Sequence, residues 1–270
     1  MAIIALHSAS TALSALSTSL DVTANNLANA NTDGFKSSRT NFQDLIYLER
    51  QQPGVENANG DQRPTGLYVG LGTRLSGTQV DFEQGGIKPT GRDLDFFIEG
   101  DGFFPLQVSE DMSPGGIAYT RAGNFALNSD GELVLATDQG RRLEPPIVIP
   151  EEASKVDVLA DGTVQVRIPG EEDPQDVGQI ELASFVNPAG LRQLGENLYA
   201  PTAASGDPDV GPADEDGRGK VGNGALEGSN VNPVNELVSL ILTQRAFELN
   251  SQSIRAADEV LRTAGQLRSF

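Results

Sequence analysis

Leucines recur every seven residues at the beginning of the chain, as Leu6, Leu13, Leu20 and Leu27. A second row, offset by three residues, holds Ala9, Leu16, Thr23 and Ala30. Two apolar or small rows with this spacing are typical of a helix that packs along one seam against other helices. Since such a helix is marginal by itself in water, the pattern predicts a packing partner.

The C-terminal segment carries the same pattern and supplies one such partner. One heptad row is Leu242, Leu249, Ala256 and Thr263, and the other is Ala246, Ser253, Val260 and Leu267. Asn232 followed by Pro233 is a typical helix start, and it predicts a helix from about Pro233 to about Gln266. Two hypotheses remain open: the terminal helices pair only with each other, or they also pack against other copies of the chain.

The faces of the first helix that lie off the seam carry almost no charge. They hold Ser10, Thr11, Ser14, Ser17, Thr18, Asn25 and Asn29. Small uncharged side chains suit burial against further helices, because they form hydrogen bonds without the desolvation of a charge. We therefore expect Asn25, Asn26, Asn29 and Asn31 to face neighbouring subunits, although a merely frayed helix end would also tolerate asparagine. Gly34 suits a left-handed residue that ends the helix.

Between the helices the sequence reads as short strands separated by glycine-rich turns. The best hairpin signals are Asn128-Ser129-Asp130-Gly131 and Asp161-Gly162. The polar stretches 51–66 and 204–224 are expected to be an extended connector and a loop. The predicted class is α+β: a discontinuous helical coiled-coil domain (1–45 and 228–270), an extended connector (46–74) and a central all-β domain (75–227).

The charge distribution restricts the function. The net charge is −19, and residues 45–229 carry −18 of it, which excludes nucleic acid as a partner. No cysteine is present, and the single histidine, His7, lies outside any arrangement typical of a nucleophilic triad. Paired acids such as Asp93 with Asp95 are typical of a solvated edge rather than an acid–base pair. We expect neither an enzyme nor a cofactor or metal site.

The sequence predicts neither a transmembrane helix nor a cleaved signal peptide. No run of residues is long and apolar enough for a transmembrane helix. The segment MAIIALHSASTALSALS lacks both a basic residue and an unbroken apolar block, so it is a poor fit to a cleaved signal peptide.

Several motifs in order resemble one known family. They are ANNLAN (24–29), NTDGFK (31–36), GDGFF (100–104), YTRAGNF (119–125), GENLY (195–199), LEGSNVN (226–232) and TQRAFE (243–248). Together they cover most of the chain, and they resemble the rod and hook proteins of the bacterial flagellar basal body. Within that family the length and the segment 50–70 are most similar to the distal rod subunits.

The resemblance implies a structural protein that polymerises helically into the distal rod, a drive shaft. The implied partners are other copies of the chain, proximal rod subunits, the hook protein or hook–rod junction, the surrounding P and L ring proteins, and the flagellar export apparatus. The implied location is the basal body from the periplasm to the outer membrane, reached by export without a cleaved signal peptide.

The heptads and the resemblance together predict an assembly interface. Its expected residues are Leu6, Leu13, Leu16, Leu20, Asn25, Asn26, Leu27, Asn29, Gly34, Phe35, Leu242, Arg245, Leu249, Ala256 and Val260. Three alternatives remain open: a proximal rod or hook-type axial subunit, a secreted β-rich oligomeric adhesin, and an enzyme with a cleft in the β domain.

Overall fold

The computed structural model describes residues 2–56, 62–170 and 173–267, and it divides the chain into two compact units. The first unit combines the described residues of Met1–Ala28, Ser38–Gln79 and Asn232–Phe270. The second combines Asn29–Ser37 with the described residues of Val80–Val231. Long helices at both ends flank a strand-rich middle, so the predicted α+β class is confirmed.

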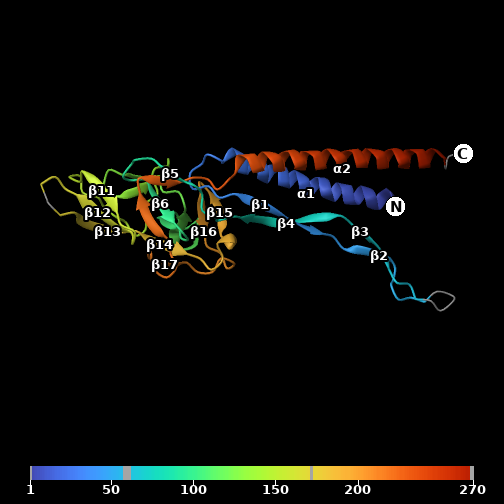
Figure 1. The fold of residues 1–270 in the computed structure, drawn as a ribbon, viewed down its shortest axis with the longest axis horizontal. Coiled ribbons are helices and arrows are strands. Elements are labelled where there is room, and N and C mark those ends of the chain that lie inside the picture. Colours follow the sequence, from blue (N-terminus) through green and yellow to red (C-terminus); the bar gives the residue numbers. More distant parts are fainter. Residues whose placement is uncertain (1, 57–61, 171–172, 268–270) are drawn as a thin grey trace. The chain divides into compact units, whose positions relative to one another are not determined.

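Two antiparallel helices dominate the first unit (Figure 1). Helix α1 spans Ala2–Ala28 and α2 spans Pro233–Leu267, close to the predicted range. The Asn232 carboxamide caps α2, because its Oδ1 accepts hydrogen bonds from the amides of Val234 (3.1 Å) and Asn235 (3.2 Å). None of the helices in the described residues is long and apolar enough to cross a membrane.

Four strands complete the first unit as two consecutive two-stranded ribbons (Figure 1). Strand β1 (Ser38–Asp44) pairs with β4 (Thr73–Val80), and β2 (Tyr47–Gln51) pairs antiparallel with β3 (Leu67–Gly70). The ribbon beside α1 is held in part by hydroxyl groups, since Thr40 Oγ1 donates to Ser19 Oγ at 3.3 Å. Most of the stretch 51–66 expected to be a connector is exposed where it is described, and 57–61 lie outside the described residues.

The second unit is built from short strands in several small sheets. Its largest sheet has the order β15-β16-β8-β7, and a three-stranded sheet has the order β11-β12-β13; the pairs are β6 with β18, β5 with β19, β14 with β17, and β9 with β10. The bounds are β5 Ile87–Pro89, β6 Phe96–Glu99, β7 Phe104–Gln107, β8 Ile117–Thr120, β9 Phe125–Leu127, β10 Leu133–Leu135, β11 Lys155–Val158, β12 Thr163–Arg167, β13 Gln175–Gln179, β14 Glu181–Ser184, β15 Arg192–Gly195, β16 Leu198–Ala200, β17 Asp209–Pro212, β18 Lys220–Asn223 and β19 Ala225–Glu227. Two short 3-10 turns lie at Pro114–Gly116 and Pro188–Gly190.

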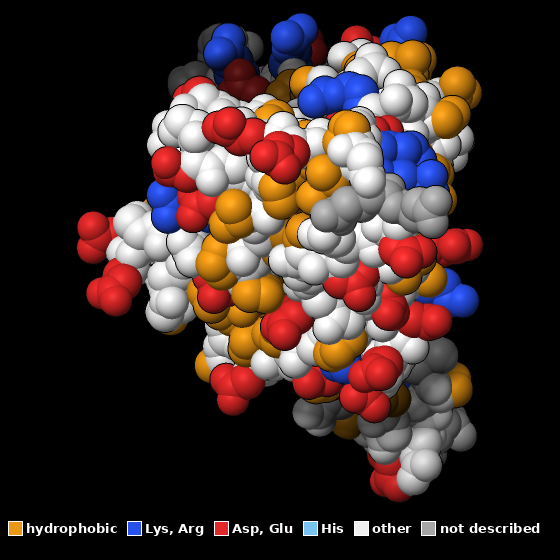
Figure 2. Space-filling model, turned by 90° about the vertical axis from the view of Figure 1, so that its left-hand side faces the viewer, with side chains coloured by type: hydrophobic (Ala, Val, Ile, Leu, Met, Phe, Trp, Pro, Cys, Tyr) orange, Lys and Arg blue, Asp and Glu red, His pale blue; other side chains and the backbone are white. Residues whose placement is uncertain are grey.

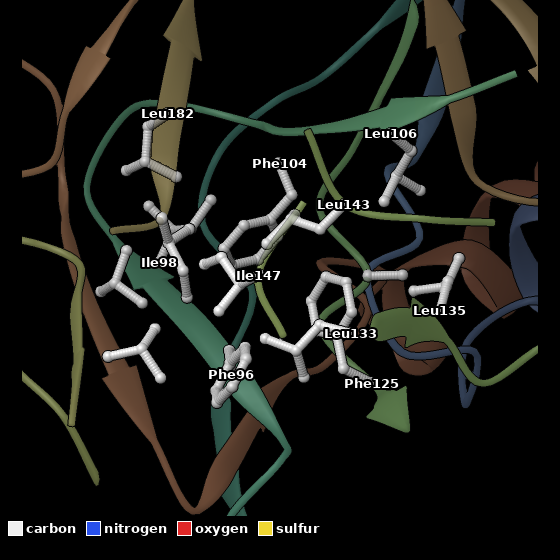
Figure 3. Close-up of a cluster of buried hydrophobic side chains, with 14 of the residues drawn as sticks. Phe96, Ile98, Phe104, Leu106, Phe125, Leu133, Leu135, Leu143, Ile147 and Leu182 are labelled. Carbon is white, nitrogen blue, oxygen red and sulfur yellow. The ribbon is translucent and has the colours of Figure 1, made fainter. Parts of the chain in front are cut away.

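The larger of two hydrophobic clusters in the described residues joins most of these small sheets. Figure 3 shows side chains of several strands converging on it, among them Phe96, Ile98, Phe104, Phe125 and Leu182. Phe104 meets Phe125 edge to face, with ring centroids 5.5 Å apart, a favoured aromatic geometry. Since no sheet is large, the shared core rather than any one ladder holds the unit together.

Both predicted hairpins are present in the second unit. Asn128–Gly131 turns β9 into β10, and Asp161-Gly162 turns β11 into β12. The expectation of a loop over residues 204–224 was wrong, because this stretch contains β17 and β18, both paired within the unit. The buried Arg218 side chain pairs with an acid of β17 and with one of the turn between the two strands, with Nη1 3.2 Å from Asp209 and Nη2 3.2 Å from Asp216.

Candidate functional site: helix surfaces and a buried charge cluster

The predicted interface residues of α1 are only partly covered. Leu6, Leu13, Leu16, Leu20 and Leu27 are half-buried. The fully buried positions of this helix are smaller residues: Ala9, Ala15, Thr23 and Asn26. Because small side chains occupy the most enclosed positions, neighbouring elements approach the helix backbone closely.

The predicted row on α2 points to solvent in the single chain. Leu242 is 64% exposed, Leu249 62% and Val260 61%. Arg245 and Ala256, which share this side of the helix, are exposed as well. Exposed leucine and valine side chains thus recur along this side of α2, with Arg245 among them.

A different row of α2 faces α1. Half-buried residues recur in steps of four and three at Glu236, Leu240, Thr243, Phe247, Asn250, Ile254 and Ala257. Glu236 shows that this face packs against α1, because its Oε1 accepts a hydrogen bond from Asn26 Nδ2 of α1 at 3.4 Å. The helix thus has one face that packs against α1 and another, with Leu249 and Val260, that is exposed. Leu242 is exposed as well and lies at the edge of a groove beside α1 and β1.

Asn26 serves the fold of its own chain. Its Nδ2 donates to the Ser38 carbonyl at 2.8 Å, and its Oδ1 accepts from the Ser38 amide at 3.0 Å. The carboxamide therefore pairs with β1 as a neighbouring strand would. Asn25 is exposed and Asn29 is half-buried, and Asn29 Oδ1 accepts a hydrogen bond from Thr32 Oγ1 at 3.1 Å.

A polar groove of about 330 Å³ lies between α1, β1 and α2 of the first unit. Its lining combines the hydroxyl groups of Ser19, Thr23, Thr40 and Thr243 with the charged Glu236 and Arg39 and the apolar Val22 and Leu242.

Gly34 and Phe35 lie in the second unit, beyond α1, which already ends at Ala28, so the expectation that Gly34 ends the helix was wrong. Gly34 has φ of 73° and is buried, and a Cβ atom on it would lie 2.6 Å from the Ala122 backbone nitrogen. Its amide donates to the Glu227 carbonyl at 2.8 Å. Only glycine satisfies both the left-handed backbone and this close approach. Phe35 is half-buried.

Three charged side chains meet in the interior of the second unit. Lys36 Nζ lies 2.6 Å from Glu227 Oε1, and Arg121 Nη1 lies 3.4 Å from Glu227 Oε2. Arg121 also donates to the Gly100 carbonyl at 2.8 Å, and its Cζ lies 5.3 Å from the Phe103 ring centroid. We call Lys36, Arg121 and Glu227 the buried charge cluster.

Burial and charge oppose each other in this cluster. Burial lowers the pKa of Lys36, while the Glu227 carboxylate acts to raise it. Burial likewise lowers the pKa of Arg121 against the opposing effect of Glu227. Asp101 and Asp81 add weaker favourable charge for Arg121 and Lys36 respectively. One buried carboxylate therefore serves two buried cations.

The cluster was not predicted from the sequence as a site. Lys36, Arg121 and Glu227 each occur in a motif quoted above, but 191 residues separate Lys36 from Glu227. A charged residue inside a stretch of small and apolar residues was the available signal. In the part of the chain that the structure describes, no group of three acidic or histidine side chains is placed to hold a metal ion.

The two units differ in charge. The second unit's sequence contains 29 acidic and 11 basic residues, which gives it −18 of the chain's −19. Figure 2 shows Asp and Glu side chains spread over the face it presents. A surface of this kind is strongly hydrated and repels other acidic surfaces.

Three family models match the chain. Residues 6–36 match "Flagella basal body rod protein", 97–166 match "Flagellar hook protein FlgE/F/G D1 domain", and 223–267 match "Flagellar basal body rod FlgEFG protein C-terminal". The flagellar basal-body rod protein FlgG of Borreliella burgdorferi is 40% identical, with 98% of both chains covered. The chain belongs to the flagellar basal-body rod protein family.

Further members of this family agree. FlgG of Caulobacter vibrioides is 40% identical over 98% of this chain and 99% of its own, and FlgG of Bacillus subtilis is 35% identical over 97% and 98%. The chain is therefore a FlgG-like distal rod protein, a structural subunit of the flagellar basal body. Relatives named for a rod point to a structural protein rather than an enzyme.

Each residue of the buried charge cluster lies in a different one of the three segments that match the family models. Lys36 lies in the first matched segment, Arg121 in the second and Glu227 in the third. The cluster therefore joins the three segments by which the rod family is recognised.

Proposed function

We propose that the terminal helices form the contacts by which copies of this rod subunit polymerise. The observation that carries the proposal is the outward row of α2, in which Leu242, Leu249 and Val260 are each more than 60% exposed. Full burial of an exposed leucine or valine side chain contributes roughly 1.5–3 kcal/mol, and covering the exposed part of each of these would contribute the larger share of that. A second copy of the chain is the natural cover, because the relatives are subunits of a rod.

The complete interface that we propose is the predicted set. It comprises Leu6, Leu13, Leu16, Leu20, Asn25, Asn26, Leu27, Asn29, Gly34, Phe35, Leu242, Arg245, Leu249, Ala256 and Val260. Within it, the exposed α2 residues are proposed to touch another copy directly. The buried Asn26 and Gly34 are proposed to act by holding the ends of α1 and its exit in place.

The test is to isolate basal bodies from cells whose only copy of the chain carries Leu13→Asp or Leu242→Asp. We expect neither variant to enter the rod, while the second unit keeps its β spectrum. Rods of normal length and content from Leu242→Asp would refute the outward row as a contact.

We further propose that residues 1–45 and 228–270 act as the polymerisation region, 46–74 as a connector and 75–227 as the outer region of the rod. The segment 51–66 is the part that resembles a distal-rod insertion. Deleting it is expected to make the shaft bend more easily, which electron microscopy of isolated rods would measure. Straight rods of unchanged stiffness would contradict a role in rigidity.

The partners and the route of delivery are also proposals. Proximal rod subunits, the hook protein or hook–rod junction, and the P and L rings are the neighbours that a distal rod subunit would meet between the periplasm and the outer membrane. Delivery by the flagellar export apparatus without a cleaved signal fits the uncharged sequence of the first 17 residues. Mass spectrometry of rods would detect an intact N-terminus under this proposal and a shortened one otherwise.

The acidic second unit suits a shaft that turns inside a ring. Its charge of −18 would keep the surface hydrated and prevent adhesion to surrounding proteins. Reversing several exposed acids in 81–216 to lysine is expected to slow rotation or impair ring assembly. Unchanged motility would contradict this role.

A further inference from the structure

The chain passes between its two units at four places, and three of these places are marked by hydrogen-bonded segments of the second unit. Unit boundaries fall after Ser37, after Gln79 and after Val231, besides the one after Ala28. The segments of the second unit that lead to these three boundaries are 34–37, 81–85 and 227–231. We call them the exit segments, and all of their contacts described below lie within the second unit.

Asn230 joins all three exit segments. Its Oδ1 accepts from the Ser37 amide at 2.8 Å, and its Nδ2 donates to the Asp81 carbonyl at 2.8 Å and the Glu83 carbonyl at 3.2 Å. The Asp81 amide in turn donates to the Ser37 carbonyl at 2.8 Å. A single carboxamide thus uses both its donor and its acceptor on the other two segments.

The Glu227 side chain joins the same three segments again, three residues away. Its Oε1 accepts from Lys36 Nζ at 2.6 Å and from the Gly85 amide at 2.9 Å. Lys36 Nζ also donates to the Glu83 carbonyl at 2.7 Å. All three segments therefore meet at one carboxylate whose side chain has no exposed surface.

Two of the exit segments also lie in direct backbone contact. A Cβ atom on Gly85 would lie 1.9 Å from the Gly228 carbonyl oxygen, so two exit segments touch backbone to backbone. Arg121 ties the assembly to the rest of the unit, because it contacts Glu227 and donates to the Gly100 carbonyl. Directional bonds of this kind fix register and geometry in a way that apolar contacts do not.

We infer that Lys36, Glu227 and Asn230 form an exit clamp that holds the three exit segments as one mechanical element. Force arriving along one connection is then shared by all three, instead of peeling one segment from the unit. These are positioning residues, and the mechanical consequence rests on the proposed function as a rod subunit. The clamp itself is a property of the single chain.

Hydrogen exchange on the purified chain tests the clamp through effects on amides that the substituted residue does not bind. Asn230→Ala removes the acceptor of the Ser37 amide but leaves the Gly85 amide its partner, Glu227. A linked clamp predicts at least tenfold faster exchange at Gly85 in Asn230→Ala, and the same acceleration at Ser37 in Glu227→Gln. Core amides such as Leu133 and Ile180, which donate to Ile147 and Gly162, should keep their protection.

Arg218→Met is the matched control, because it removes a buried arginine of the same unit that bonds Pro212, Asp209 and Asp216 instead of the exit segments. It should leave Ser37 and Gly85 unchanged. The clamp would be overturned if each variant lost protection only at the amide that the substituted residue binds. It would also be overturned if every variant lost protection equally in the exit segments and in the core. If Glu227→Gln does not fold, the exchange rate of the Gly85 amide in Asn230→Ala is sufficient to test the clamp.

Swimming at high viscosity tests the consequence for the rod. Cells with Asn230→Ala rods are expected to swim normally at low load and to lose speed or break rods at high load. Arg218→Met cells should show no such load dependence. Faster exchange without any load defect would refute load sharing but keep the clamp, whereas failure of the wild-type chain to enter rods would refute the proposed function alone.

Discussion

Lys36 Nζ lies 2.6 Å from Glu227 Oε1, and neither side chain has any exposed surface. Burying two opposite charges costs desolvation, and good geometry only partly offsets it. Here the same carboxylate also serves Arg121, so the three side chains hold two positive charges and one negative. Because of this imbalance, losing the Glu227 carboxylate should destabilise the unit more than losing Lys36.

Glu227→Gln is therefore expected to destabilise the second unit more than Lys36→Met. Removing the carboxylate charge leaves two buried cations without their counterion, which should cost about 3–5 kcal/mol. Removing the lysine leaves Arg121 paired, and the lost charge-assisted bonds should cost about 1.5–3 kcal/mol. Urea unfolding followed by circular dichroism measures both. Lys88→Met, which breaks an exposed pair with Asp33, is the control; a larger loss for Lys36→Met than for Glu227→Gln would contradict this order.

Leu249→Asp is expected to abolish incorporation into rods without unfolding the chain. The side chain is 62% exposed in the single chain, so the folded subunit tolerates a carboxylate there. In an assembled rod the same carboxylate would be desolvated without a partner. Gln244→Asp, at an exposed position on another side of α2, adds the same charge and should assemble. Basal bodies probed for the chain give the readout; equal incorporation of both variants would disprove the contact.

Asn26→Ala is expected to loosen the junction between α1 and β1. It leaves both backbone groups of Ser38 without the carboxamide, which should cost about 1–3 kcal/mol. Ser17→Ala, at an exposed position of α1, should change stability by no more than about 0.5 kcal/mol. Thermal unfolding monitored on the helical signal compares them. Equal stability of the two variants would mean that the pairing with Ser38 is energetically neutral.

Gly34→Ala combines two penalties that can be separated. The left-handed backbone, with φ of 73°, should cost about 1–2 kcal/mol, and the contact with the Ala122 backbone at 2.6 Å adds to it. Gly91 has a similar φ of 70° but open space around its Cβ position, so Gly91→Ala reports the backbone penalty alone. We expect Gly34→Ala to lower the unfolding midpoint further than Gly91→Ala does. Matching midpoints would show that Ala122 moves aside freely.

Alkaline pH is expected to destabilise the second unit through Tyr199. Burial raises the pKa of this phenol above its usual value, so the folded state resists ionisation while the unfolded chain ionises near pH 10. The unfolded state then binds fewer protons than the folded one, and stability falls as pH rises above about 10. Burial raises the pKa of Tyr119 in the same direction.

Tyr199→Phe isolates this effect from the other titrating groups. The difference in unfolding free energy between wild type and variant should be constant below about pH 10 and shift in favour of the variant above it. Urea titrations at several pH values supply the measurement. A difference that does not change with pH would show that the phenol ionises equally in both states.

The sequence by itself determined the features that depend on neighbouring residues. The two long helices, the Asn232 cap and the hairpin turns at Asn128–Gly131 and Asp161-Gly162 follow from local periodicity, capping and turn chemistry. The motifs in order also pointed to the rod family. Local polarity misled where long-range pairing overrode it, as in β17 and β18, where the buried Arg218 pairs with Asp209 and Asp216.

Only the tertiary structure decided how each helix face is used. The heptad analysis singled out the row of Leu242 and Leu249, which is exposed, whereas the row that packs against α1 is a different one that contains Glu236 and Phe247. Asn26 looked like a surface amide, but it binds Ser38 of its own chain. Lys36 and Glu227 meet across 191 residues. Periodicity is a property of adjacent residues, whereas the choice of partner depends on contacts that only the folded chain creates.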